Sequence, residues 1–135
     1  MRSLLILSIF FFFGISHAQT NSLAAPQIAI KIPLGETVVL GDVSITFEKV
    51  IEDSRCPEGV QCVWAGNAKI LVNVSHDGGT SNEKIVLFEN GKQPTLFEDE
   101  KKIFRALQLN PYPVSSDQGK SGRAYVLLIS EVSAG

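Results

Sequence analysis

The chain has 135 residues, 44% of them hydrophobic and 19% charged, and its twelve Lys and Arg against fourteen Asp and Glu give a formal net charge of −2. This length predicts a single domain that is long enough to bury a hydrophobic core. The slightly acidic balance, with no basic stripe, argues against nucleic acid as a partner.

The first eighteen residues have the three-part layout of a secretory signal peptide. Arg2 supplies the positive charge, residues 4–15 form an apolar run of twelve, and Ser16-His17-Ala18 places small residues at the two positions that a signal peptidase reads. The run is too short to cross a bilayer, which takes about 20 residues; an uncleaved N-terminal anchor is the alternative. We expect cleavage after Ala18 and export to the periplasm or out of the cell.

Cleavage would leave a mature chain of 117 residues, and because it removes Arg2, eleven basic and fourteen acidic residues give a formal net charge of −3. The remaining sequence has no second apolar stretch of membrane-spanning length, so we expect no membrane insertion of the mature chain. Residues 19–26 are small and polar and are expected to form a loose lead-in. The β-domain is expected over residues 27–135.

From residue 27 onwards, hydrophobic residues recur mostly at every second position, which is typical of strands with one buried and one exposed face. The strands that this alternation predicts are residues 28–32, 37–40, 43–51 and 68–75. Within 43–51, Phe47 and Ile51 are expected to share the buried face, which Lys49 interrupts. Two continuous apolar runs, 85–88 and 125–129, predict strands covered on both faces.

Residues 103–109 are a weaker strand candidate, because Arg105 interrupts the apolar run. Asn90-Gly91 is the strongest short hairpin signal, since a type I′ turn needs positive φ at both central residues. Pro94 just beyond it predicts an edge strand, because proline cannot donate to the ladder. We therefore predict an all-β fold: a single small domain of seven to eight mostly antiparallel strands, arranged as a sandwich or a barrel.

Residues 53–67 hold both cysteines and the only tryptophan of the chain within fifteen positions. On an exported chain, Cys56 and Cys62 predict a disulfide that closes a ring of seven residues. Pro57 restricts φ and Gly59 permits the sharp turn that so short a ring needs. Such a cross-link stabilises by roughly 2 kcal/mol in the chain-entropy model, so we expect it mainly to fix the local shape.

The spacing of the cysteines disfavours metal and redox chemistry. Structural zinc sites place cysteines two to four residues apart and need four ligands, whereas five residues separate this pair and the mature chain offers one histidine, His76, and no methionine. A thiol oxidoreductase would have Cys-x-x-Cys at a helix N-terminus. We expect no metal site, no cofactor and no catalytic residue, and we expect His76 to lie on the surface.

The same loop offers the residues for a contact surface. Trp64 admits two interpretations, an indole that packs over the disulfide or an exposed aromatic contact, and we favour packing. A local Asp53–Arg55 pair, or plain solvation, explains the charges that precede the ring. The candidate binding residues are Arg55, Pro57, Glu58, Gly59 and Trp64.

The string Asp-Ser-Arg-Cys-Pro-x-x-Val-x-Cys-x-Trp-Ala-Gly at residues 53–66 resembles an uncharacterised family of small exported bacterial proteins. The features that follow are also similar to that family: Leu107 and Leu109, Pro111-Tyr112-Pro113, and a last apolar strand from Tyr125. The resemblance implies a bacterial, exported, mostly β domain. It implies no activity and no catalytic residues.

These observations favour a non-enzymatic binding or structural module of the bacterial cell envelope. Its partner would be a protein or another envelope component, and the chain itself would be a monomer. One alternative is an inhibitor of an exported hydrolase, because a rigid loop loses little freedom on binding. Another is a small carboxylate-dependent hydrolase, which would need Asp53 or Glu58 to meet a distant acidic residue in a cleft.

Overall fold

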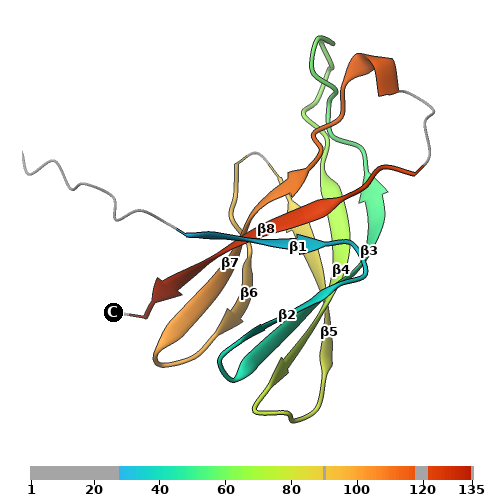
Figure 1. The fold of residues 1–135 in the computed structure, drawn as a ribbon. Coiled ribbons are helices and arrows are strands. Elements are labelled where there is room, and N and C mark those ends of the chain that lie inside the picture. The colour runs from blue at the N-terminus through green and yellow to red at the C-terminus, as the bar shows by residue number, and fades with distance from the viewer. Residues whose placement is uncertain (1–27, 90, 118–121, 135) are drawn as a thin grey trace, which may run out of the picture.

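Eight strands form two antiparallel sheets in the part of the chain that the structure describes (Figure 1). A computed structural model describes residues 28–89, 91–117 and 122–134. The expected signal peptide, residues 1–18, and the lead-in, residues 19–26, lie outside the described residues. The all-β prediction is confirmed, and because the two sheets are separate, the arrangement is a sandwich.

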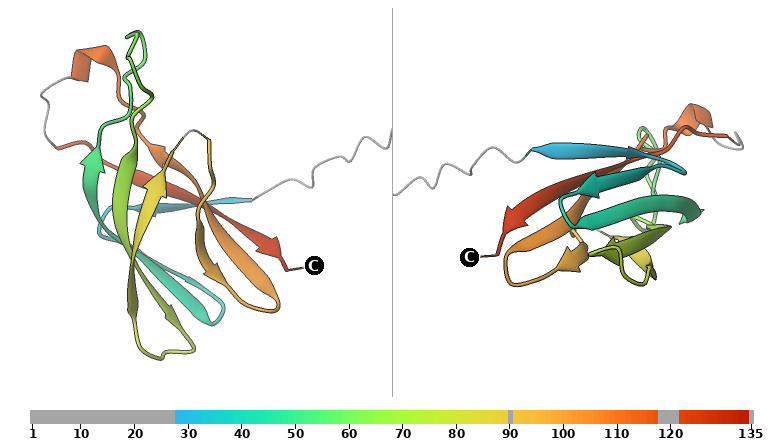
Figure 2. Two further views of the ribbon diagram at one scale, coloured as in Figure 1. Left: turned by 180° about the vertical axis from the view of Figure 1, so that it is seen from behind. Right: turned by 60° about the horizontal axis from the view of Figure 1, so that its bottom comes forward.

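Each sheet contains four strands. The first sheet has the order β1 (Ala29–Pro33), β8 (Val126–Ser133), β7 (Lys102–Asn110) and β6 (Thr95–Glu98). The second has the order β2 (Thr37–Leu40), β3 (Val43–Asp53), β4 (Ala68–His76) and β5 (Asn82–Phe88). The strands of the two sheets run in clearly different directions, as Figures 1 and 2 both show.

The core lies between the facing sides of the sheets. Period-two alternation sends every second side chain of the central strands inward, where apolar burial stabilises the fold. The most buried large side chains are Ile32, Ile45, Phe47, Ile70, Phe104, Leu109, Leu127 and Ile129. The strand at 103–109 is confirmed as part of β7, which is central in its sheet.

Two register shifts interrupt the pairing of β3 with β4, one between Phe47 and Lys49 and one between Val50 and Glu52. A bulge inserts an extra residue and so reverses the alternation beyond it. Phe47 is buried, whereas Ile51 is exposed. The prediction that these two share the buried face was therefore wrong, because period two holds only up to the first bulge.

Strand β5 corrects a second prediction. It is the edge strand of its sheet, and Ile85 is 64% exposed while its neighbour Val86 is buried. The apolar run at residues 85–88 is thus covered on one face, and the expectation of burial on both faces was wrong there. No strand pairs with the far side of β5 within the described ranges.

The expected hairpin at Asn90-Gly91 is also corrected. Strands β5 and β6 belong to different sheets, so the chain crosses from one sheet to the other between them. Asn90 itself lies outside the described residues, but the Lys92 N–H donates to the Glu89 carbonyl at 2.8 Å, as in a reverse turn. The edge strand predicted from Pro94 is confirmed, because β6 begins directly after it and forms the edge of its sheet.

One end of the sandwich carries two long excursions that rise beyond the sheets side by side (Figures 1 and 2). The first, residues 54–67, joins β3 to β4 and is called the disulfide loop below. The second follows β7 and contains a short 3₁₀ helix, Ser115–Asp117. Within the described ranges, the chain forms no helix suited to spanning a membrane.

Candidate functional site at the disulfide loop

The two limbs of the disulfide loop continue the β3–β4 pairing beyond the sheet. The Ser54 N–H donates to the Asn67 carbonyl at 2.8 Å, and the Cys56 N–H donates to the Ala65 carbonyl at 2.8 Å. Gly66 stands between these pairs with φ at +69°, and a Cβ built there would lie 1.8 Å from the Ser54 carbonyl oxygen. Only glycine fits at this position, so the close approach of the limbs depends on it.

The predicted disulfide between Cys56 and Cys62 is present, with 5.9 Å between the two Cα atoms. The first half of the ring is also attached to the second excursion. The Glu58 N–H donates to the Pro113 carbonyl at 2.9 Å, and Glu58 forms an isolated parallel bridge with Val114. The ring is therefore held by a covalent bond and by backbone hydrogen bonds from two directions.

Below the ring, Arg55 forms the predicted local pair with Asp53. Its Nε and Nη2 donate to the two carboxylate oxygens at 2.8 Å each, which is the bidentate geometry that suits guanidinium and carboxylate. The side chains of Arg55 and Asp53 are only 8% and 6% exposed. Arg55 was a candidate binding residue, and the structure places its charged group inside the molecule.

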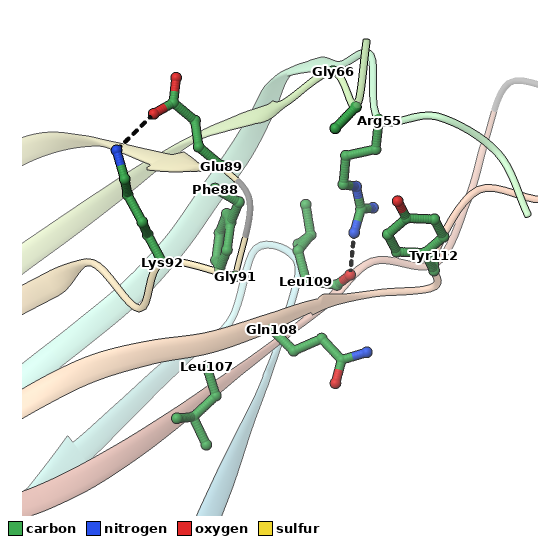
Figure 3. A pocket seen from close by; sticks show the side chains of 11 residues that line it. Arg55, Gly66, Phe88, Glu89, Gly91, Lys92, Leu107, Gln108, Leu109 and Tyr112 are labelled. Carbon is green, nitrogen blue, oxygen red and sulfur yellow. Dashed lines mark hydrogen bonds and ion pairs between the residues drawn. The ribbon is translucent and has the colours of Figure 1, made fainter. Parts of the chain in front are cut away.

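Arg55 also reaches the second excursion. Its Nη1 donates to the Leu109 carbonyl at 2.7 Å, its Nη2 donates to the Pro111 carbonyl at 3.1 Å, and its guanidinium lies 4.8 Å from the ring centre of Tyr112. Figure 3 shows the Tyr112 ring beside this guanidinium. These contacts join the base of the disulfide loop to the end of β7, so Arg55 links the two sheets.

Asp53 makes the complementary connection to the residues that precede β8. The Tyr125 hydroxyl donates to Asp53 Oδ2 at 3.0 Å, and Arg123 Nη1 lies 3.4 Å from the same oxygen. Burial acts to raise the pKa of Asp53, but the hydrogen bonds and charge of Arg55, with the Tyr125 hydroxyl, outweigh it and hold the pKa below its ordinary value. We call Asp53, Arg55, Arg123 and Tyr125 the Asp53 cluster.

The outer part of the loop is exposed. Val63 is fully exposed and Trp64 is 80% exposed. The favoured interpretation of Trp64, packing over the disulfide, was wrong, because its side chain is left largely uncovered where the loop projects past the sheets. Of the other candidate residues, Glu58 and Gly59 are exposed and Pro57 is half-buried.

Two shallow hollows flank the return limb of the loop, which is the limb that leads back into β4. Both hollows are lined in part by Ala65, Gly66 and Glu89. The first, of about 280 Å³, lies between Arg55 and Tyr112 on one side and the Glu89–Lys92 pair on the other (Figure 3). The second, of about 310 Å³, is lined by Trp64 together with Glu52 and Asn67.

A group with metal-ligand chemistry lies away from this loop. Asp42, His76 and Asp77 bring three ligand atoms within 4.8 Å of one another, and all three residues are exposed, which confirms His76 as a surface residue. Lys102 already makes an ion pair with Asp42, and its hydrogen bond is the largest of the causes that lower the pKa of Asp42 to about 2. A cation at this group would therefore have to displace a lysine ammonium.

Comparisons with known proteins add no relative. No protein-family model, no curated protein and no solved structure matches the chain.

Sequence reasoning missed most of the residues that hold the loop in place. Arg123 and Tyr125 lie about seventy positions from Asp53 in the sequence. Tyr112 comes just after β7, a strand of the other sheet. The spacing of the local pair Asp53-x-Arg55 was the available signal. The resemblance drew attention to the segments that contain Tyr112 and Tyr125, but nothing in the sequence connects them with this pair, because they meet it only after the two sheets pack.

Proposed function

We propose that the protein is an exported, non-enzymatic binding module of the bacterial cell envelope, with the disulfide loop as its contact surface. The observation that carries the proposal is the loop itself, which projects beyond the sandwich (Figure 1). The Val63 and Trp64 side chains on this loop are exposed. Tryptophan is enriched among the residues that dominate binding energies. A loop held in one shape also loses little freedom when it binds.

Two observations support export from the cytoplasm, which is part of the proposal. The Cys56–Cys62 disulfide fits an oxidising environment outside the cytoplasm. The first eighteen residues have the layout of a signal peptide, with an apolar run that ends in Ser16-His17-Ala18.

The buried position of Arg55 redistributes the roles of the candidate residues. Arg55 holds the loop on the sandwich through four hydrogen bonds to Asp53, Leu109 and Pro111. Glu58, Gly59 and Trp64 remain as candidates for direct contact, and Val63 joins them. We infer that replacing Arg55 would weaken binding by altering the loop, whereas replacing Trp64 would remove a contact.

An inhibitor of an exported hydrolase is the second candidate function. It requires that the tip of the ring be free to enter a cleft, and residues 58–60 are exposed. A carboxylate-dependent hydrolase gains no support from Asp53, because the hydrogen bonds and charge of Arg55, with the Tyr125 hydroxyl, hold its pKa below the ordinary value. A general acid needs the opposite shift of its pKa.

The test is site-specific photo-crosslinking in the natural envelope. A photoreactive residue at position 63 is expected to capture one partner, and adding Trp64→Ala is expected to reduce the yield severalfold. The control places the same photoreactive residue at position 83. Glu83 is exposed on β5, at the opposite end of that strand from Glu89.

Three results distinguish the candidate functions. Capture of an exported hydrolase, whose activity falls on adding the purified protein, would favour the inhibitor. Capture of another envelope component would support the binding module. No product from position 63, or the same product from position 83, would overturn the loop as the contact surface.

A further inference from the structure

The hollow beside Trp64 has an unusual lining. It lies where the end of β3, the end of β5 and the return limb of the disulfide loop meet, and its volume is about 310 Å³. Glu52 contributes a carboxylate from β3, and Glu89 contributes one from just beyond β5. Trp64 supplies an indole that is 80% exposed. The hollow thus combines an aromatic surface with two acidic groups.

Ser54 and Asn67 are the other polar residues that line this hollow. Asn67 Oδ1 is buried and has no hydrogen-bond partner among the described residues. The Ser54 hydroxyl, which also lines the hollow, donates to the Asn67 carbonyl at 3.1 Å. Because two acidic residues and an exposed indole line the hollow, a ligand that brings N–H groups and positive charge matches it.

Each of the two carboxylates has a lysine beside it. Lys69 Nζ lies 2.9 Å from Glu52 Oε2, and Lys92 Nζ lies 3.3 Å from Glu89 Oε2. The hydrogen bond from Lys69 is the largest of the causes that lower the pKa of Glu52, so this carboxylate stays ionised. Exposed pairs of this kind are worth little in water, and both lysines have exposed side chains that can turn towards solvent.

We propose that this hollow binds the basic side chain, Lys or Arg, of a protein partner. The cation would lie against the Trp64 indole, which is the aromatic ring that attracts cations most strongly. Glu52 and Glu89 would supply the opposite charge. The inference deepens the proposed function and rests on it, since it specifies the partner of the same loop.

A protein side chain fits better than a free small cation for two reasons. Val63 is fully exposed beside Trp64, and burying it requires a partner that also presents an apolar surface. The charge of the loop also suits a basic partner, because Glu58 is a further exposed acidic residue on the same loop. A partner that places a basic residue next to apolar ones would complement both features.

The single tryptophan makes the test direct, because the emission of the folded protein excited at the indole band reports Trp64 alone. The probe is n-butylguanidinium, and its neutral control is n-butylurea. We expect a saturable change in Trp64 emission with the guanidinium and none with the urea. In Glu52→Gln/Glu89→Gln, the affinity is expected to fall by about fivefold or more, whereas Glu83→Gln should leave it unchanged.

Three results of the butylguanidinium titration would overturn the inference: no saturable change, an equal response to butylurea, or equal affinity in the double variant. Glucosamine serves as a second cationic probe, and tighter binding of glucosamine than of butylguanidinium would assign the hollow to an amino sugar instead. The crosslinking result is independent of these outcomes. A partner captured at position 63, together with a negative titration, would retain the binding module and reject its basic side chain.

Discussion

At the scale of single residues, the disulfide loop depends on groups that a motif alone would assign to binding. Arg55 stands beside the ring, yet its guanidinium is directed inward and donates to a carboxylate and two carbonyls. Removing one member of a buried, hydrogen-bonded ion pair leaves the other charge without compensation, which costs about 3–5 kcal/mol. The charge of Arg55 thus serves the position of the loop.

Gly66 offers a residue-scale test of how closely the limbs of the loop must approach. Gly66→Ala adds a Cβ that would lie 1.8 Å from the Ser54 carbonyl oxygen, at a positive φ. We expect a loss of about 3 kcal/mol or more in the free energy of unfolding, measured by urea denaturation. Gly78→Ala is the matched control, because Gly78 also has positive φ but no atom within 4 Å of the added Cβ; it should cost about 1 kcal/mol.

If Gly66→Ala and Gly78→Ala lost the same amount of unfolding free energy, the backbone conformation alone would matter, and the limbs could separate without cost.

At the scale of elements, the two faces of the second sheet differ more than the apolar sequence of β5 indicates. Ile70 on β4 pairs with Val86, and both are buried between the sheets. Leu71 pairs with Ile85 on the outer face of the same two strands. Neighbouring apolar positions on β5 therefore have opposite environments, which is the ordinary consequence of the pleat.

Two isoleucines test this difference with identical chemistry. Ile70→Ala removes a fully buried side chain and is expected to cost about 3 kcal/mol, because it leaves a cavity in the core. Ile85→Ala on the outer face is expected to cost less than about 1 kcal/mol. Thermal unfolding of both variants measures the contrast. A large loss in Ile85→Ala would indicate that another surface covers β5 in solution.

At the scale of the whole molecule, the Asp53 cluster joins the two sheets at the end that carries the disulfide loop. Asp53 ends β3 in one sheet, while Tyr125 directly precedes β8 in the other. Arg55 extends the connection to the end of β7. The position of the disulfide loop is therefore coupled to the packing of the two sheets at this end.

The acid sensitivity of the fold tests this coupling. The pKa of Asp53 in the folded state is lowered from its ordinary value of 3.8, so its stabilising contribution is present above that value and is lost as the pH falls through the folded pKa. Asp53→Asn is expected to destabilise the protein by about 3 kcal/mol at pH 7. The difference in the free energy of unfolding between the wild type and this variant should become smaller below about pH 4. Chemical denaturation at a series of pH values measures it. A constant difference down to pH 2 would contradict this role of Asp53.

Local patterns in the sequence determined several features of this protein. Alternating hydrophobicity predicted most of the strands, Pro94 predicted an edge, and two cysteines six positions apart predicted the disulfide. These features depend on neighbours in the chain, because a side-chain period, a missing N–H and a short covalent ring are all set by nearby residues.

Only the tertiary structure decided which sheet each strand joins, and therefore which faces are covered. It placed β5 and β6 in different sheets, although Asn90-Gly91 indicated a hairpin. It brought Leu109 and Tyr125 to the pair formed by Asp53 and Arg55, across 54 and 72 positions of the chain. It also left the Trp64 side chain largely exposed. Period and spacing describe the polarity of a face, whereas its partner is chosen by packing between residues far apart in sequence.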